Sequence, residues 1–222
     1  MGFMSIVADN IRNIREELSD YQGRVIAVSK YVSKEDMLEA YDTGIRDFAE
    51  SKTQDALAKM NNLPEGMKND CVWHFIGHLQ TNKAKKVVGE FDYIHSVDSL
   101  KLVKVVNDLA EEKGLVQKIL LQVNIADEDT KFGFSSEELF KVFPEIVSLK
   151  NIKIEGLMMM APYSNDEVYL TALFAKLKKL KEKLECVFGL SIKELSMGMS
   201  NDFKIAINYG ATKVRLGRIF LL

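Results

Sequence analysis

One lysine stands where a short apolar strand would end. Residues 25–29 are a β-rich run, Val-Ile-Ala-Val-Ser, and Lys30 follows it directly. In parallel α/β proteins ligands bind at the carboxyl ends of the strands, and a lysine that loses its hydration there can have a lowered pKa and react as a free amine. The plainer alternative is a lysine that extends into solvent at the start of a loop. Lys30 is therefore a candidate for Schiff-base chemistry.

A second group of residues, near the carboxyl end of the chain, has the composition of an anion site. Ser200 falls where a helix is expected to begin, after Met-Gly-Met at 197–199, and Gly217 lies just past the last expected strand. Helix amino termini offer unpaired N–H groups to an anion, and the loops after strands seven and eight bind phosphate in many (β/α)8 barrels. A serine that served only as an N-cap would leave the glycines unexplained. The pattern favours a phosphate site.

A lysine at one end of a site and a phosphate cradle at the other suit pyridoxal phosphate. Its aldehyde can form an aldimine with Lys30 while its phosphate lies near Ser200 and Gly217. Arg215, in the last expected strand, would then lie near the ring nitrogen. Because arginine keeps its proton, it can donate to an unprotonated pyridine but cannot protonate it. The ring would be a poorer electron sink, which disfavours carbanion chemistry.

Other polar residues also fall at expected strand ends: Glu50, His74, His78, His95, Asn124 and Ser196. His74 and His78 have the i,i+4 spacing of metal ligands, but that spacing converges only on a helix, and this segment has the pattern of a strand entering a turn. Zinc is therefore disfavoured, and a histidine hydrogen-bonded inside the fold explains His74 as well as a ligand role does. No nucleophile elbow supports a Ser/His/Asp triad.

The elements that would position these residues alternate along the whole chain. Strands are expected at 25–30, 45–48, 72–76, 93–96, 117–123, 152–157, up to Ser196, and 212–216. Helices are expected at 3–19, 33–44, 51–60, 81–88, 99–113, 136–148, 166–187 and 201–209. Eight strands that alternate with helices predict one (β/α)8 barrel domain, 1–222, with an extra N-terminal helix. An open doubly wound sheet would need a glycine-rich turn after its first strand, and residues 29–32 are not one.

The balance of charged residues argues against nucleic acids and membranes as partners. The 222 residues carry 30 basic and 32 acidic side chains, a formal charge of -2, so no general attraction to nucleic acid or membranes is expected. Cys71 and Cys186 are far apart without metal-ligand spacing, which fits a reducing cytoplasm. The first nine residues lack a basic n-region, and no apolar run reaches the ~20 residues of a membrane span. We expect a cytoplasmic monomer or weak dimer.

Short segments along nearly the whole chain form a specific set. They are Ala-Val-Ser-Lys at 27–30, Trp-His-Phe-Ile-Gly-His-Leu-Gln-Thr-Asn-Lys at 73–83, His-Ser-Val-Asp at 95–98, Gln-Val-Asn at 122–124, Lys-Phe-Gly at 131–133, Gly-Leu-Met at 156–158, Leu-Ser-Met-Gly-Met-Ser at 195–200 and Val-Arg-Leu-Gly at 214–217. This set resembles the pyridoxal phosphate homeostasis proteins (YggS/PROSC type). The resemblance implies a barrel like the alanine racemase N-terminal domain, a lysine aldimine, and no established turnover.

The resemblance also implies a job and a site. The job is to bind pyridoxal phosphate and hand it to apo-enzymes that need it, which keeps the free aldehyde low. The implied cofactor-binding residues are Lys30, Ser51, His78, Asn124, Met199, Ser200, Arg215, Gly217 and Arg218. Ser51 stands where the family commonly has an asparagine near the ring, and Lys204 replaces a usual acidic residue. Arg218 replaces a small residue, so its backbone N–H can still serve the phosphate.

Two other functions compete with a carrier. An amino-acid racemase or decarboxylase could use the same aldimine, but enzymes of this barrel class bring a second domain, and all 222 residues are assigned to the barrel. Tyr31 could supply an acid–base group, although a packing role suits a tyrosine at a strand end. A Schiff-base aldolase of sugar phosphates would need buried carboxylates around the lysine, and only Glu50 offers one. The sequence therefore favours a cofactor carrier.

Overall fold

The fold is a closed barrel of eight parallel strands in the order β1 to β8, with β1 paired to β8. The computed structural model describes residues 6–126 and 132–217. The strands are β1 Arg24–Val28, β2 Asp47–Glu50, β3 Val72–Phe75, β4 Tyr93–Val97, β5 Gln117–Gln122, β6 Ile152–Met158, β7 Glu194–Met199 and β8 Lys213–Leu216. The (β/α)8 barrel predicted from the alternating pattern is confirmed.

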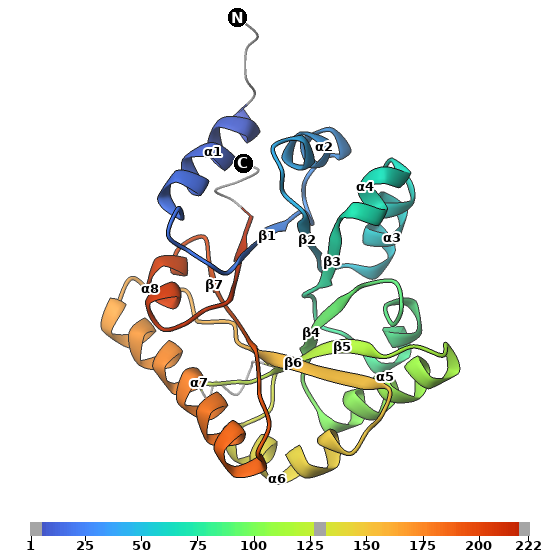
Figure 1. Ribbon diagram of the computed structural model, residues 1–222, viewed down its shortest axis with the longest axis vertical. Coiled ribbons are helices and arrows are strands. Elements are labelled where there is room, and N and C mark those ends of the chain that lie inside the picture. The colour runs from blue at the N-terminus through green and yellow to red at the C-terminus, as the bar shows by residue number, and fades with distance from the viewer. Residues whose placement is uncertain (1–5, 127–131, 218–222) are drawn as a thin grey trace, which may run out of the picture.

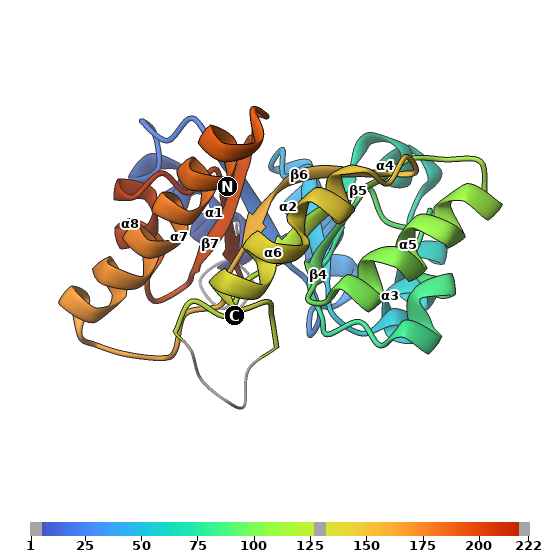
Figure 2. The same ribbon diagram turned by 90° about the horizontal axis from the view of Figure 1, so that it is seen from below.

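Helices surround the strands (Figures 1 and 2). They are α1 Ile6–Glu17, α2 Lys34–Asp42, α3 Thr53–Asn61, α4 Glu65–Asp70, α5 Leu100–Glu112, α6 Ser136–Val147, α7 Glu167–Phe188 and α8 Phe203–Asn208, with a 3-10 helix, η1, at Thr81–Lys86. Helix α1 precedes β1, so the predicted extra N-terminal helix is present. None of the helices in the described residues is long and apolar enough to cross a membrane.

Local sequence signals set most of the helix ends. The hydroxyls of Ser33, Ser99 and Ser135 accept the backbone N–H three residues on, and these serines begin α2, α5 and α6. The carboxylate of Asp166 does the same for α7. Helix α7 ends at Gly189, whose positive φ of 65° is a conformation that glycine adopts without strain.

The apolar core lies between the barrel and its helices. Helix α7 buries one stripe, as its spacing predicts: Leu170, Leu173, Phe174, Leu177, Leu180 and Leu184. Most of the lysines on the opposite face are exposed, although Lys176 donates to the Ile125 carbonyl at 3.0 Å. Inside the barrel the strands also bury polar side chains, which include Asp47, His74, His95, Ser196 and Arg215. The barrel therefore has an apolar outer core and a partly polar interior.

Several predicted boundaries were wrong. Strand β2 begins at Asp47 rather than residue 45, because its backbone pairing with β3 begins at Asp47 and Val72. The expected helix at 81–88 is the 3-10 helix η1, and a short helix that was not expected, α4, precedes β3. Strand β7 runs on to Met199 instead of ending at Ser196. His74, His95 and Ser196, which were grouped with the polar residues at strand ends, are buried within their strands.

Gly77 is expected to tolerate no side chain. A Cβ there would overlap the carbonyl oxygen, the carbonyl carbon and the Cα of Ser51. These are backbone atoms, so they cannot move aside without a shift of the chain. We expect Gly77→Ala to lower the free energy of unfolding by about 2 kcal/mol or more, the range of overpacked sites. Urea unfolding would measure this difference.

Gly66 supplies the matched control for that substitution. It lies in helix α4, and a Cβ there would meet nothing within 4 Å. Gly66→Ala should therefore stabilise the protein by about 0.5 to 1 kcal/mol through backbone entropy. Equal effects of the two alanines would show that the loop after β3 yields to the added methyl group.

Candidate functional site

Lys30 lies at the barrel mouth, two residues beyond the end of β1. Its side chain is exposed, and its Nζ lies 5.2 Å from the centroid of the Tyr31 ring. Tyr31 is itself 71% exposed, so the expected packing role of this tyrosine is wrong. The amine is therefore open to a ligand that enters from the carboxyl ends of the strands.

The residue before Lys30 is held from several sides. The Ser29 N–H donates to the Ala49 carbonyl at 2.9 Å, and its hydroxyl donates to Glu50 Oε1 at 2.8 Å. Lys59 Nζ donates to the Ser29 carbonyl at 2.6 Å and pairs with Glu50 Oε1 at 2.9 Å. Glu50, which was expected beyond β2, is the buried last residue of that strand. The exposed amine thus extends from a fixed backbone.

Ser200 and Gly217 meet at the ends of the neighbouring strands β7 and β8. The Gly217 N–H points to the Ser200 hydroxyl at a long 3.4 Å. Helix α8 begins only at Phe203, with Asp202 as its N-cap residue, so Ser200 is not the cap and lies in the turn that precedes it. Asp202 Oδ1 accepts the backbone N–H of Met199 at 2.5 Å. Met199, Ser200 and Gly217 therefore share one corner of the mouth.

Arg215 is buried in β8, directly beside Ile26 of β1 in the ladder. Its guanidinium donates to the Ser196 hydroxyl at 2.6 Å and to the Met159 carbonyl at 2.9 Å. Burial lowers the pKa of Arg215 to about 10, against the opposing charge of Asp202, so the group is still a cation at neutral pH. This gives a fixed positive donor below the corner formed by Ser200 and Gly217.

The other predicted site residues lie farther around the mouth. His78 is partly exposed; its Nδ1 lies 3.2 Å from Asp98 Oδ2, and its ring stacks on Phe132 at 3.6 Å between centroids. Asn124 follows β5 and donates its backbone N–H to Phe134 at 2.9 Å. Ser51 follows β2 and packs its backbone against Gly77. Arg218 lies outside the described residues.

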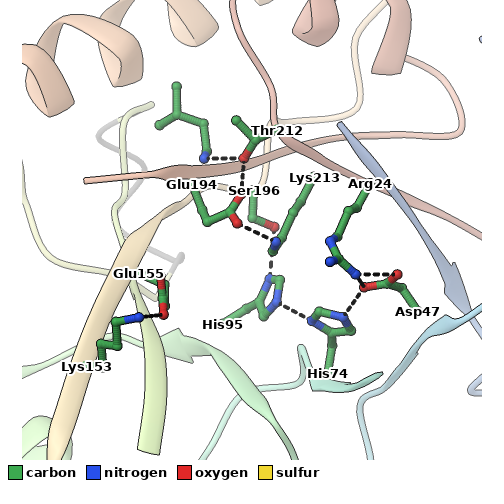
Figure 3. Close-up of polar contacts among 11 residues, drawn as sticks. Arg24, Asp47, His74, His95, Lys153, Glu155, Glu194, Ser196, Thr212 and Lys213 are labelled. Atoms are coloured by element: carbon green, nitrogen blue, oxygen red, sulfur yellow. Dashed lines mark hydrogen bonds and ion pairs between the residues drawn. The ribbon is translucent and has the colours of Figure 1, made fainter. Parts of the chain in front are cut away.

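A hydrogen-bonded chain inside the barrel was missed by the sequence reasoning. Arg24 pairs with Asp47 at 3.1 Å, and Asp47 Oδ1 lies 3.0 Å from His74 Nε2. His74 Nδ1 lies 2.9 Å from His95 Nε2, and His95 Nδ1 lies 2.9 Å from the Ser196 hydroxyl. Figure 3 shows this path. A sequence signal did exist, because an aspartate inside a four-residue buried strand demands a polar partner.

Known proteins resemble this chain over most of its length. The sequence family described as "Alanine racemase, N-terminal domain" matches residues 4–221. The "Pyridoxal phosphate homeostasis protein" of Synechocystis sp. is 44% identical over 88% of this chain and 89% of its own, and that of Aquifex aeolicus is 37% identical over 88% and 85%. The relationship therefore extends across the whole barrel.

Solved structures agree with this assignment. PipY of Synechococcus elongatus, determined with PLP bound, superposes with a TM-score of 0.88 at 34% identity and covers 97% of this chain and 100% of its own. Alanine racemase of Clostridium difficile has a TM-score of 0.77 at 17% identity and shares the fold, with 56% of its chain covered. The chain therefore belongs to the pyridoxal phosphate homeostasis protein family, whose barrel is that of the alanine racemase N-terminal domain.

Proposed function

We propose that this barrel, acting as a single domain, binds pyridoxal phosphate through Lys30. The observation that carries the proposal is the convergence of three groups at the ends of adjacent strands: an exposed amine after β1, the Ser200–Gly217 corner after β7 and β8, and the buried Arg215 cation in β8. These match the aldehyde, the phosphate and the ring nitrogen of the cofactor. The PipY structure, which was determined with PLP bound, supports binding of this cofactor by the barrel.

Within this site each residue has a defined part. The Lys30 amine condenses with the aldehyde to an aldimine and releases one water, and hydrolysis returns the free aldehyde, so the attachment is reversible. Met199, Ser200 and Gly217 surround the phosphate, and a contact from Arg218, which lies outside the described residues, stays a prediction from the sequence. Arg215 donates to the ring nitrogen without protonating it. Ser51, His78 and Asn124 border the ring side of the mouth.

We further propose that the protein holds and releases the cofactor without catalytic turnover. Carbanion chemistry needs a ring that withdraws electrons and an acid–base group at the reacting carbon. An arginine at the ring nitrogen disfavours the first requirement. Tyr31, the candidate for the second, is turned to solvent at 71% exposure. The recipients are apo-enzymes that need pyridoxal phosphate, served in the cytoplasm by a monomer or weak dimer.

The absorbance spectrum tests the binding proposal. Wild-type protein incubated with pyridoxal phosphate should show a visible aldimine band, and Lys30→Ala should lose it completely. Borohydride reduction followed by peptide mapping should place the added mass on Lys30. Lys52→Ala is the matched control, because this lysine is also at the mouth and 63% exposed. A band that survives in Lys30→Ala would refute the assignment of the tether.

Amino acids added to the loaded protein separate carrier from enzyme. A carrier should give no chiral inversion and no carbon dioxide beyond one equivalent per site. Multiple turnovers with any amino acid would overturn the carrier function and favour the racemase or decarboxylase alternative.

A further inference from the structure

A continuous line of short polar contacts crosses the interior of the barrel. It joins Asp47 on β2 to His74 on β3, His95 on β4, Ser196 on β7 and Arg215 on β8, with successive distances of 3.0, 2.9, 2.9 and 2.6 Å. Strands β4 and β7 are not neighbours in the barrel, so the contact between His95 and Ser196 must pass through its centre. The line ends on the arginine proposed to face the cofactor ring.

The Asp47 end fixes the direction in which protons are donated. Both carboxyl oxygens of Asp47 accept from Arg24 Nη1, at 3.1 and 3.3 Å, and this contact with a guanidinium cation favours the ionised carboxylate. Burial alone would raise the pKa of Asp47, but the hydrogen bonds from His74 and Arg24 and the charge of Arg24 outweigh it and lower that pKa. His74 must therefore present Nε2–H to the carboxylate.

Both histidines are neutral in this surrounding. Burial lowers the pKa of His74, although Asp47 opposes that shift. Burial also lowers the pKa of His95 well below its ordinary value, and the positive charges of Arg215 and Lys213 act in the same direction. A neutral imidazole has one donor and one acceptor nitrogen. With His74 Nε2 as donor, its Nδ1 must accept from His95 Nε2–H.

The same logic carries the direction to Arg215. Because His95 donates from Nε2, its Nδ1 accepts, and the hydroxyl of Ser196 must donate to it. The Ser196 oxygen is then free to accept from the guanidinium at 2.6 Å. In the opposite direction His95 would donate to Ser196, and the serine proton would have to find another acceptor in the interior.

We propose that Asp47, His74, His95 and Ser196 form a one-directional hydrogen-bond chain that positions Arg215 for the cofactor ring. All donation runs from Arg215 toward Asp47, and both histidines are the Nε2–H tautomer. The positioning of Arg215 toward the cofactor ring rests on the proposed function, whereas the direction of hydrogen-bond donation does not. These residues touch neither cofactor nor solvent-exposed amine, so they are positioning residues. Asp47 also lines a pocket of about 300 Å³ with Arg24 at the amino ends of β1 and β2, so the chain links the two ends of the barrel.

The tautomers can be read without any cofactor. The whole protein has 3 histidines. Long-range proton–nitrogen correlation spectra of protein labelled in its imidazole nitrogens would therefore contain few signals to assign. We expect both His74 and His95 as neutral Nε2–H imidazoles at neutral pH. An Nδ1–H tautomer or an imidazolium at either position would overturn the chain.

Asp47→Asn tests whether Asp47 sets the direction. Arg24 would hold the amide oxygen, which turns the amide NH2 toward His74 Nε2. Both histidines should then switch together to the Nδ1–H tautomer, and pyridoxal phosphate should dissociate about tenfold more readily, the loss expected for one hydrogen bond to a charged group. A switch of His74 alone, or of neither, would contradict the proposal.

Ser196→Ala cuts the chain at its other end. Here Asp47 still sets the direction, so both tautomers should remain Nε2–H, while cofactor affinity should fall about tenfold and the aldimine band should shift. Unchanged affinity and an unchanged band would overturn the positioning role. This variant keeps the proposal testable if Asp47→Asn does not fold.

Glu155→Gln is the matched control. Glu155 is a buried carboxylate of the same interior that pairs with Lys153 at 2.6 Å, away from the chain (Figure 3). Its replacement should change neither tautomers nor cofactor affinity, and a change in both would contradict the specific path proposed. Failure of wild-type protein to bind the cofactor would overturn the proposed function and the ring role together, while the tautomers would still decide the direction of the chain.

Discussion

Lowering the pH from about 6.5 to about 5 is expected to lower the free energy of unfolding, by at most about 1.4 kcal/mol per pH unit for each interior histidine that stays neutral in the folded protein. His74 and His95 have pKa values held below the ordinary 6.5 by burial, so the folded protein does not bind the protons that the unfolded chain binds. Above pH 6.5 the histidines are neutral in both the folded and the unfolded protein, so they do not make the free energy of unfolding depend on pH. Below that value the unfolded chain binds protons that the folded protein does not, so the free energy of unfolding falls. Urea unfolding at a series of pH values would measure the slope.

The carboxylates act in a lower pH window. The pKa values of Asp47 and Glu194 are lowered despite burial, which alone would raise them, because Asp47 bonds His74 and Arg24 and Glu194 bonds Lys213 and Thr212. Their contribution is lost only as the pH falls through those lowered values. Between 6.5 and 5 the slope should thus come from the histidines, which face Asp47, Asp92, Lys213 and Arg215.

A histidine variant isolates this effect. His95→Gln removes the histidine whose pKa is lowered further, so it should reduce the slope below the wild-type value, whatever its effect on stability at pH 7. A free energy of unfolding that stays constant between pH 6.5 and 5 in the wild type would show that the interior histidines are already accommodated as cations.

The fold could be predicted because its signals are local. Apolar runs, serine caps such as Ser33 and glycine stops such as Gly114 each act within a few residues, and their alternation sets the barrel. Boundaries failed where a tertiary contact decided them. Asp47 lies inside the expected strand 45–48, yet it is the first residue of β2, because the pairing of β2 with β3 begins there.

The mouth of the site was predicted better than the interior. Lys30, Ser200 and Gly217 follow strands, so a correct strand order is enough to bring them to one end of the barrel. Placement of His74, His95 and Ser196 depends on which face of each strand points inward, and a shift of one residue reverses that face. The pairing of His95 with Ser196 spans 101 residues of sequence and is visible only once β4 and β7 face each other.

The ion pair between Lys59 and Glu50 lies next to Lys30, the proposed attachment site of the cofactor, and involves a residue outside the predicted set. Glu50 is 1% exposed and Lys59 18% exposed, and Lys59 also donates to the Ser29 carbonyl at 2.6 Å, next to Lys30. Among the described residues, Glu50 Oε2 is a buried oxygen without a hydrogen-bond partner. Removal of Lys59 would therefore leave a buried carboxylate that keeps the hydrogen bond from the Ser29 hydroxyl but loses its ion pair.

Lys59→Met is expected to lower the free energy of unfolding by about 3 to 5 kcal/mol, the cost of one partner lost from a buried ion pair. Urea unfolding would measure this loss, and Glu50→Gln added to Lys59→Met should recover more than half of it because the stranded charge is gone. Lys52→Met, on an exposed lysine 3.9 Å from Asp55, should cost no more than about 0.5 kcal/mol. If Lys59→Met lowered the free energy of unfolding no more than Lys52→Met does, the ion pair between Lys59 and Glu50 would not stabilise the backbone at Ser29. Pyridoxal phosphate binding at Lys30 would then not depend on this ion pair. We expect instead that the single variant weakens binding and that the double variant restores only the stability, because the Ser29 carbonyl still lacks its lysine donor.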